Sequence, residues 1–118
     1  MKLEEPEMLD QLIKNSQELV ERNWDDDPKK KLSLSQLARN QIRNILDMAQ
    51  ATDSFRALEI FIRYQAGRKT ISHEFAEDLI VELEKIQKES GIETVRLYLG
   101  YMYRYFVWKG SLKGGTND

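Results

Sequence analysis

The fold of this chain is decided by its last long apolar run, ETVRLYLGYMYRYFVWK at residues 93–109. Projected at about 100° per residue, four of its non-apolar residues share one narrow stripe: Glu93, Arg96, Gly100 and Arg104. Apolar side chains occupy most of the remaining circumference, so other structure must cover most sides of this helix. The run is shorter than the roughly 20 apolar residues that a bilayer needs, and it contains two arginines. We therefore predict the central helix of a soluble bundle, or a helix shared with another subunit.

The same run holds four tyrosines, Tyr98, Tyr101, Tyr103 and Tyr105. A buried hydroxyl without a hydrogen-bond partner costs on the order of 1–3 kcal/mol. We therefore do not expect all four hydroxyls to be buried, and we expect part of this helix to lie at an edge or an interface.

Length and composition describe one ordinary domain with few catalytic groups. The 118 residues are enough to bury a single core without disulfides or metal. The chain has no cysteine and one histidine, His73, which excludes thiolate chemistry, disulfides and metal sites built on histidine pairs. Because no apolar segment leads the sequence, we expect no signal peptide and a cytoplasmic location. No catalytic residue, metal ligand or cofactor is predicted, and we do not expect an enzyme.

Charge is distributed unevenly along the chain. Residues 1–28 hold 3 basic and 9 acidic side chains, whereas residues 29–71 hold 9 basic and 3 acidic ones. These two segments therefore carry −6 and +6, and residues 72–118, with 6 basic and 8 acidic side chains, bring the net charge to −2. A near-neutral total thus conceals a basic segment as long as a helical hairpin.

Hydrophobic periodicity predicts helices and no strand, which indicates an all-α compact bundle of about five helices in a single domain, residues 1–110. Capping signals mark the helix ends. Ser33 with Gln36 forms a capping box, Thr52-Asp53-Ser54 and Ser72 supply the N-caps of the third and fourth helices, and Gly67 and Gly91 stand at C-cap positions. The first helix, within residues 1–24, can pack on its own bundle or be exchanged with a partner. The other expected segments are a linker at 25–32, helices at 33–49, 55–66, 72–89 and 93–109, and a flexible tail at 111–118.

Six basic side chains are the candidate RNA-binding residues: Arg39, Arg43, Arg56, Arg63, Arg68 and Lys69. The first four are predicted to face outward from the second and third helices, and the last two follow the third helix directly. A patch of this kind contacts phosphate and does not read base sequence. The alternative is a solvated face balanced by intrahelical ion pairs, with the last two cations compensating the helix dipole.

An acidic run, Asp25-Asp26-Asp27, precedes Pro28. Clustered carboxylates can bind magnesium, but no second acidic cluster or phosphate-binding loop accompanies this run in the sequence. We therefore interpret it as part of a solvated linker that ends the first helix. His73 falls in the first turn of the fourth predicted helix without a ligand partner in the sequence, and we interpret it as a surface residue.

Two segments of the second and third predicted helices resemble a known family. NQIRNIL at residues 40–46 is similar to the signature that opens the conserved region of the small subunit of the type III-A CRISPR effector, the Csm complex. IRYQAGR at residues 62–68 resembles the Y-x-A-G-R segment of that family, and RYFVWK at residues 104–109 is a looser match to its aromatic C-terminal helix. The resemblance covers residues 33–109, and residues 1–32 match nothing in the family.

The resemblance implies a small helical protein present in several copies along an RNA-guided ribonucleoprotein. In that role the chain would contact guide RNA, target RNA and the other effector subunits, would self-associate as a dimer or a stack, and would supply no catalytic residue. Base pairing would read sequence, which leaves charge and shape to the protein. The residues leave open a second function, a helical adaptor or oligomerisation module that binds only proteins. No membrane contact is expected for either function.

Overall fold

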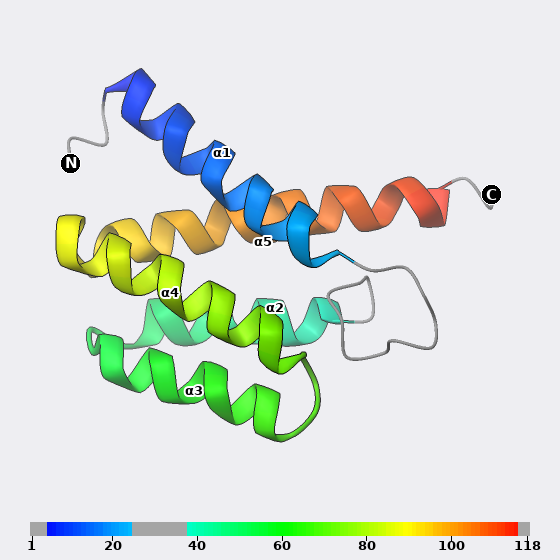
Figure 1. The fold of residues 1–118 in the computed structure, drawn as a ribbon. Helices are drawn as coiled ribbons and strands as arrows, with labels where there is room; N and C mark the ends of the chain where they lie inside the picture. The colour runs from blue at the N-terminus through cyan, green and yellow to red at the C-terminus, as the bar shows by residue number, and fades with distance from the viewer. Residues whose placement is uncertain (1–4, 25–37, 116–118) are drawn as a thin grey trace.

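The computed structural model of the chain describes residues 5–24 and 38–115. The expected linker, the Ser33 capping box and the Asp25–Asp27 run lie outside these residues. The described part contains no strand, so the prediction of an all-α bundle of about five helices is confirmed. The helices are α1 (Pro6–Asn23), α2 (Arg39–Ala51), α3 (Phe55–Gly67), α4 (His73–Ser90) and α5 (Ile92–Gly115), as Figure 1 shows.

The predicted central helix, α5, packs against α1, α2 and α4, whereas α3 lies farther out against α2 and α4 (Figure 1). Tyr98 is fully buried, while Tyr101, Tyr103 and Tyr105 are half-buried, so the expectation that the four hydroxyls would not all be covered is confirmed. The side chains that α5 contributes to the shared core are Val95, Tyr98, Leu99, Met102 and Phe106.

α5 is longer than the sequence predicted. It continues to Gly115, through residues that we expected to belong to the flexible tail. Glycine inside a helix costs about 1 kcal/mol relative to alanine, so Gly110 weakens the helix without ending it. In this last part the Ser111 hydroxyl donates to the Trp108 carbonyl at 2.6 Å. The C-terminal part of α5 consequently projects beyond the other helices (Figure 1).

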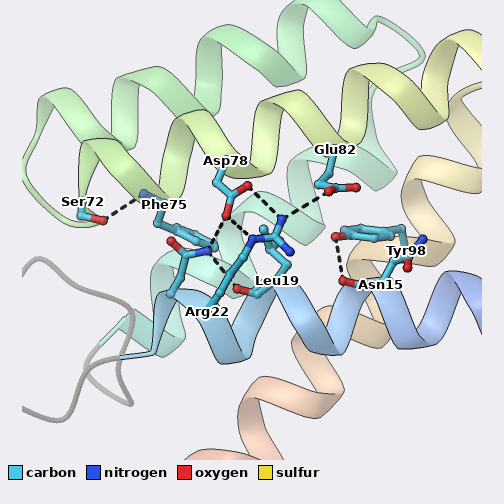
Figure 2. A network of polar contacts seen from close by, with 9 residues as sticks. Asn15, Leu19, Arg22, Ser72, Phe75, Asp78, Glu82 and Tyr98 are labelled. Atoms are coloured by element: carbon cyan, nitrogen blue, oxygen red, sulfur yellow. Dashed lines mark hydrogen bonds and ion pairs between the residues drawn. The ribbon is translucent and has the colours of Figure 1, made fainter.

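α1 docks on the bundle of its own chain through both apolar and polar contacts. Figure 2 shows the Arg22 guanidinium facing two carboxylates of α4, with Nε 2.8 Å from Asp78 and Nη2 3.2 Å from Glu82. Asn23 also donates to Asp78, at 2.8 Å. Exchange of α1 between copies stays a prediction. In an exchanged dimer, Arg22 and Asn23 would make the same contacts with α4 of the other copy. The buried apolar side chains of α1 are Leu12, Leu19 and Val20.

The end of α3 differs from the expectation that Gly67 would be the C-cap. Gly67 is the last helical residue, and Lys69, with φ 63°, adopts the left-handed conformation. The Thr70 N–H donates to the Gln65 carbonyl at 3.1 Å, and the Lys69 N–H donates to the Ala66 carbonyl at 2.9 Å, the pair of bonds that closes a helix at a left-handed residue. The Thr70 hydroxyl donates to the same Gln65 carbonyl at 2.9 Å, which favours this later ending.

Because α3 ends at a left-handed Lys69, we expect two substitutions to stabilise the fold: removal of the glycine at position 67 and introduction of a glycine at position 69. Gly67 is helical and a Cβ there would meet nothing within 4 Å, so Gly67→Ala should raise the free energy of unfolding by about 0.5–1 kcal/mol. Lys69→Gly should raise it by about 1 kcal/mol, because a left-handed residue with a Cβ is strained. Urea denaturation measures both variants. Destabilisation by Gly67→Ala would show that Gly67 holds the left-handed position instead of Lys69.

Candidate nucleic-acid interface

α2 and α3 form an antiparallel hairpin connected by residues 52–54, with Ser54 capping α3 as the sequence predicted. The start of α2 and the end of α3 therefore lie at the same end of the hairpin (Figure 1). Four of the six candidate residues are consequently brought to one end of the bundle, and we call them the hairpin-end cluster: Arg39, Arg43, Arg68 and Lys69.

Arg39 and Arg43 converge on Tyr103 of α5. The guanidinium carbon of Arg43 lies 5.6 Å from the centre of the Tyr103 ring. The two neighbouring guanidinium groups, Arg39 first, lower the pKa of the Tyr103 hydroxyl, because a nearby cation favours the ionised form. Arg43 is also paired with Asp47, at 3.0 Å between Nε and Oδ1. Arg39 is exposed and has no acidic partner among the described residues, so it is the freer cation for a phosphate.

The turn after α3 supplies the other half of the cluster. The guanidinium carbon of Arg68 lies 5.6 Å from the centre of the Tyr64 ring, one helical turn earlier. Tyr64 is 58% exposed, so a cation and an aromatic ring are presented together to solvent. Lys69 is exposed in the left-handed position that glycine would occupy at lower cost. Within the described part of the chain, neither Arg68 nor Lys69 has an acidic partner.

Arg63 differs from these four residues because it connects α3 to α4. Its Nη1 lies 2.6 Å from Glu59, and its Nε lies 3.2 Å from Glu77 of α4. The two carboxylates, Glu77 first, raise the pKa of Arg63. Arg56 lies at the far end of α3, where it lines a shallow depression together with Ile60. We therefore place Arg56 and Arg63 outside the hairpin-end cluster, and Arg63 is partly neutralised by an acid that sequence reasoning did not assign to it.

Two aromatic residues of this surface were absent from the sequence-based site. Tyr103 was missed because it comes from α5, and no spacing rule connects it to the arginines of α2. Tyr64 lies inside the IRYQAGR segment, but its position in the sequence also fits the apolar side of its helix. The four-residue interval between Tyr64 and Arg68 is a signal that could have identified this pair, because residues at i and i+4 are neighbours on a helix.

The outer faces of α1 and α4 carry mainly acidic side chains, in contrast to the hairpin-end cluster. Lys85 and Lys88 are exposed on α4 and reduce this negative charge locally. The bundle therefore has surfaces of opposite charge on different helices. The exposed acidic residues are Glu7, Asp10, Glu18 and Glu21 of α1, and Glu74, Glu77, Glu84 and Glu89 of α4.

Comparisons of the chain with known protein families, curated proteins and solved structures gave no match. Over residues 5–24 and 38–115, no helix combines the length and the apolar character needed to cross a membrane. The same residues contain no group of three or more His, Cys, Asp or Glu side chains that could hold a metal ion. His73 is exposed at the start of α4. The hairpin-end cluster is therefore the surface from which we infer a function.

Proposed function

We propose that this chain is a non-catalytic, RNA-contacting scaffold subunit of an RNA-guided effector complex, like the small subunit of the type III-A CRISPR (Csm) complex. The observation that carries the proposal is the meeting of residues 40–46 and 62–68, the two segments that resemble this family, at one end of the α2–α3 hairpin. Arg43 belongs to the first segment and Arg68 to the second. A shared surface is what two segments of one binding site require.

The chemistry of the cluster suits contact with an RNA backbone. Arg39, Arg68 and Lys69 are exposed and lack acidic partners within the described residues, so a bound phosphate can replace counterions at each of them. Tyr64 and Tyr103 hold neighbouring guanidinium groups by cation–π contact, which lowers the ordering cost of binding. Such contacts position an RNA without reading its bases, and in a guided complex the pairing of guide with target supplies the sequence.

The same role implies defined partners for the subunit. It would contact guide RNA, target RNA and other effector subunits in the cytoplasm, and it would need neither a cofactor nor a metal. The acidic faces of α1 and α4 and the basic hairpin end make one copy electrically two-sided. Copies can therefore stack head to tail, and contacts of that kind form open arrays unless the rotation closes.

The test removes two cations of the cluster together, Arg39→Ala with Arg68→Ala. From counterion release at about 0.7 per phosphate on a single strand, the double variant should lose about 25-fold in affinity at about 0.1 M salt. The slope of log affinity against log salt should fall by about 1.4. Fluorescence anisotropy with unrelated labelled RNAs measures both quantities, and the loss should be the same for every sequence.

The matched control is Lys85→Ala with Lys88→Ala, which removes the same charge from the exposed face of α4. It should change affinity and salt slope much less than the cluster variant. Equal losses in the two double variants would show that net charge acts without a localised site, and unchanged binding in the cluster variant with an intact circular dichroism spectrum would contradict the proposal.

A second candidate function is a helical adaptor that binds only proteins. It is favoured by two large apolar side chains that α3 presents to solvent, Ile60 at 66% and Tyr64 at 58% exposure. Clustered apolar side chains on a surface mark protein contact sites. Salt separates the two functions, because RNA affinity falls steeply with ionic strength whereas an apolar contact between helices persists.

A further inference from the structure

One side of α5 exposes large apolar side chains toward its C-terminal end, where no helix of the described chain covers them. Trp108 is 52% exposed and Leu112 is 50% exposed, while α1, α2 and α4 pack on the other sides of the helix. Residues spaced by three and four positions share one face of a helix. We call the residues that follow this spacing the α5 stripe: Leu97, Tyr101, Arg104, Trp108 and Leu112.

The α5 stripe differs from the narrow non-apolar stripe of the sequence, Glu93, Arg96, Gly100 and Arg104. The non-apolar stripe of the apolar run included Arg96, but the Arg96 side chain turns inward, with Nε 2.8 Å from the Ala49 carbonyl at the end of α2. The exposed side is consequently rotated toward Arg104 and Trp108. Trp108 therefore faces solvent although it lies outside the polar stripe of the sequence.

The rings of this face are held in place by their neighbours. The guanidinium carbon of Arg104 lies 5.1 Å from the centre of the Tyr101 ring. The Trp108 and Tyr105 ring centres are 5.4 Å apart with an interplanar angle of 39°. The Tyr105 hydroxyl is in turn hydrogen-bonded to Glu21 of α1. Arg104, Tyr101 and Trp108 are thus held by neighbours before a ligand binds, which reduces the entropy cost of ordering them on binding.

The charge of α5 identifies the kind of ligand. Residues 94–115 contain four basic side chains and no acidic one. Arg96 is bonded to the end of α2 and Lys109 is paired with Glu21 at 3.0 Å, whereas Arg104 has no acidic partner in the part of the chain that the structure describes. An exposed cation between a half-buried and an exposed aromatic ring, on a helix whose one acid, Glu93, lies in its first turn, is complementary to a ligand that is anionic and has flat apolar surfaces.

We propose that the α5 stripe is a stacking surface for unpaired nucleic-acid bases, with Tyr101 and Trp108 as the platforms and Arg104 between them. The proposal rests on the proposed RNA-binding function and adds a second contact of different chemistry. The hairpin-end cluster takes phosphates of any RNA, whereas the stripe takes only bases that are free of a duplex. Base stacking on aromatic side chains tolerates every base because each base has a flat face.

The dimensions of the stripe agree with a short stretch of single strand. Tyr101 and Trp108 are separated by seven residues, which is about 10 Å along a helix. That length equals the rise of about three stacked nucleotides at about 3.4 Å each. A second copy seated symmetrically on the stripe is disfavoured, because antiparallel pairing about the middle of the stripe would place Arg104 near its own counterpart, and like charges that meet in an interface are costly.

Trp108 reports directly on the proposed contact, because it is the exposed one of two tryptophans and Trp24 is half-buried against Phe106. Addition of oligouridylate of about 20 nucleotides should quench the fluorescence of the full chain, and a duplex RNA of similar length should quench it much less. Trp108→Phe keeps a ring and should bind normally while losing most of the quenching. Persistence of the full quenching in Trp108→Phe would assign the signal to Trp24 and overturn the proposal.

Affinity supplies a second measurement. Trp108→Leu keeps an apolar side chain but removes the ring, and it should weaken oligouridylate binding by about 5- to 150-fold, the range measured for loss of one stacked base. Duplex affinity should change less than about twofold. Leu112→Ala, on the same face without a ring, is the matched control and should leave both affinities near those of the parent chain.

The outcomes separate this proposal from the proposed function. If Trp108→Leu binds oligouridylate normally while Arg39→Ala with Arg68→Ala loses binding to both RNAs, the stacking surface is wrong and the backbone contact stands. If Trp108→Leu instead alters sedimentation without altering RNA affinity, the stripe is a protein interface and the proposal falls. If the parent chain binds neither RNA at low salt, both inferences are contradicted.

Discussion

Arg96→Ala is expected to lower the free energy of unfolding by about 2–3 kcal/mol. The Arg96 side chain, 24% exposed, closes the end of α2: its Nε donates to the Ala49 carbonyl at 2.8 Å and its Nη2 donates to the Thr52 carbonyl at 2.8 Å. Carbonyls in the last turn of a helix have no partner within it, and a cation there is stabilising. Hydrogen bonds to a charged group each contribute about 1.5–3 kcal/mol, and alanine would remove both. Because the site is partly exposed, water replaces part of the two bonds, and the loss is smaller than their sum.

Thermal denaturation followed by circular dichroism should show this loss as a fall in Tm of about 10 °C. Arg96→Lys keeps the cation but cannot form the same pair of bonds, and it should lose roughly half as much. Arg104→Ala removes an arginine from the exposed face of the same helix and should change the free energy of unfolding by less than about 0.5 kcal/mol. Equal effects of Arg96→Ala and Arg104→Ala would contradict the placement of Arg96 at the end of α2.

Tyr98→Phe is expected to change the free energy of unfolding slightly at neutral pH and to raise it at alkaline pH. Burial first, and then the negative charge of Glu82, raise the pKa of the Tyr98 hydroxyl well above its ordinary value. At pH 7 the substitution removes one long hydrogen bond, 3.5 Å from the hydroxyl to the Asn15 carbonyl (Figure 2), so the change should stay within about 1 kcal/mol.

Above about pH 10 this tyrosine ionises in the unfolded chain, which lowers the free energy of the unfolded state, while the folded chain holds the tyrosine protonated. The contribution of Tyr98 is therefore fully present below about pH 10 and is lost as the pH rises toward its raised value in the folded chain. By about pH 11.5 the loss reaches about 2 kcal/mol, and Tyr98→Phe, which cannot ionise, should then be more stable than the parent chain by about 1–2 kcal/mol. Urea denaturation across pH measures the crossing, and parallel stability curves for the two chains would contradict the burial of Tyr98.

The sequence determined the secondary structure to a large extent, because helical periodicity and capping depend on residues at most a few positions apart. Ser54 and Ser72 cap α3 and α4, as predicted, through bonds that their own sequence neighbours provide. Gly91, with φ 88°, ends α4 in the predicted place. The same local rules failed at Gly67 and Gly110, where glycine is tolerated inside a helix. α3 ends instead at the left-handed Lys69, through the bonds of residues 69 and 70 to the carbonyls of Ala66 and Gln65.

The sequence also located the basic segment and the two segments that resemble a family, and it named every arginine of the hairpin-end cluster. It could not tell which of the six candidate side chains lack a partner in the folded chain. Arg63 meets Glu77 only because α4 packs on α3, and Arg39 with Arg43 meets Tyr103 only because α5 packs on α2. These partners lie on different helices, and the spacing of residues along the sequence does not indicate the distance between side chains of two packed helices.

The exposed side of α5 was likewise decided by tertiary structure. A helix that is apolar on most of its circumference gives no periodic signal for which apolar side stays uncovered. Three neighbouring helices and the inward turn of Arg96 make that choice, and they leave Trp108 and Leu112 in solvent. Local intervals therefore determined the helices of this protein, while the packing of distant helices decided which cations and which rings remain available to a partner.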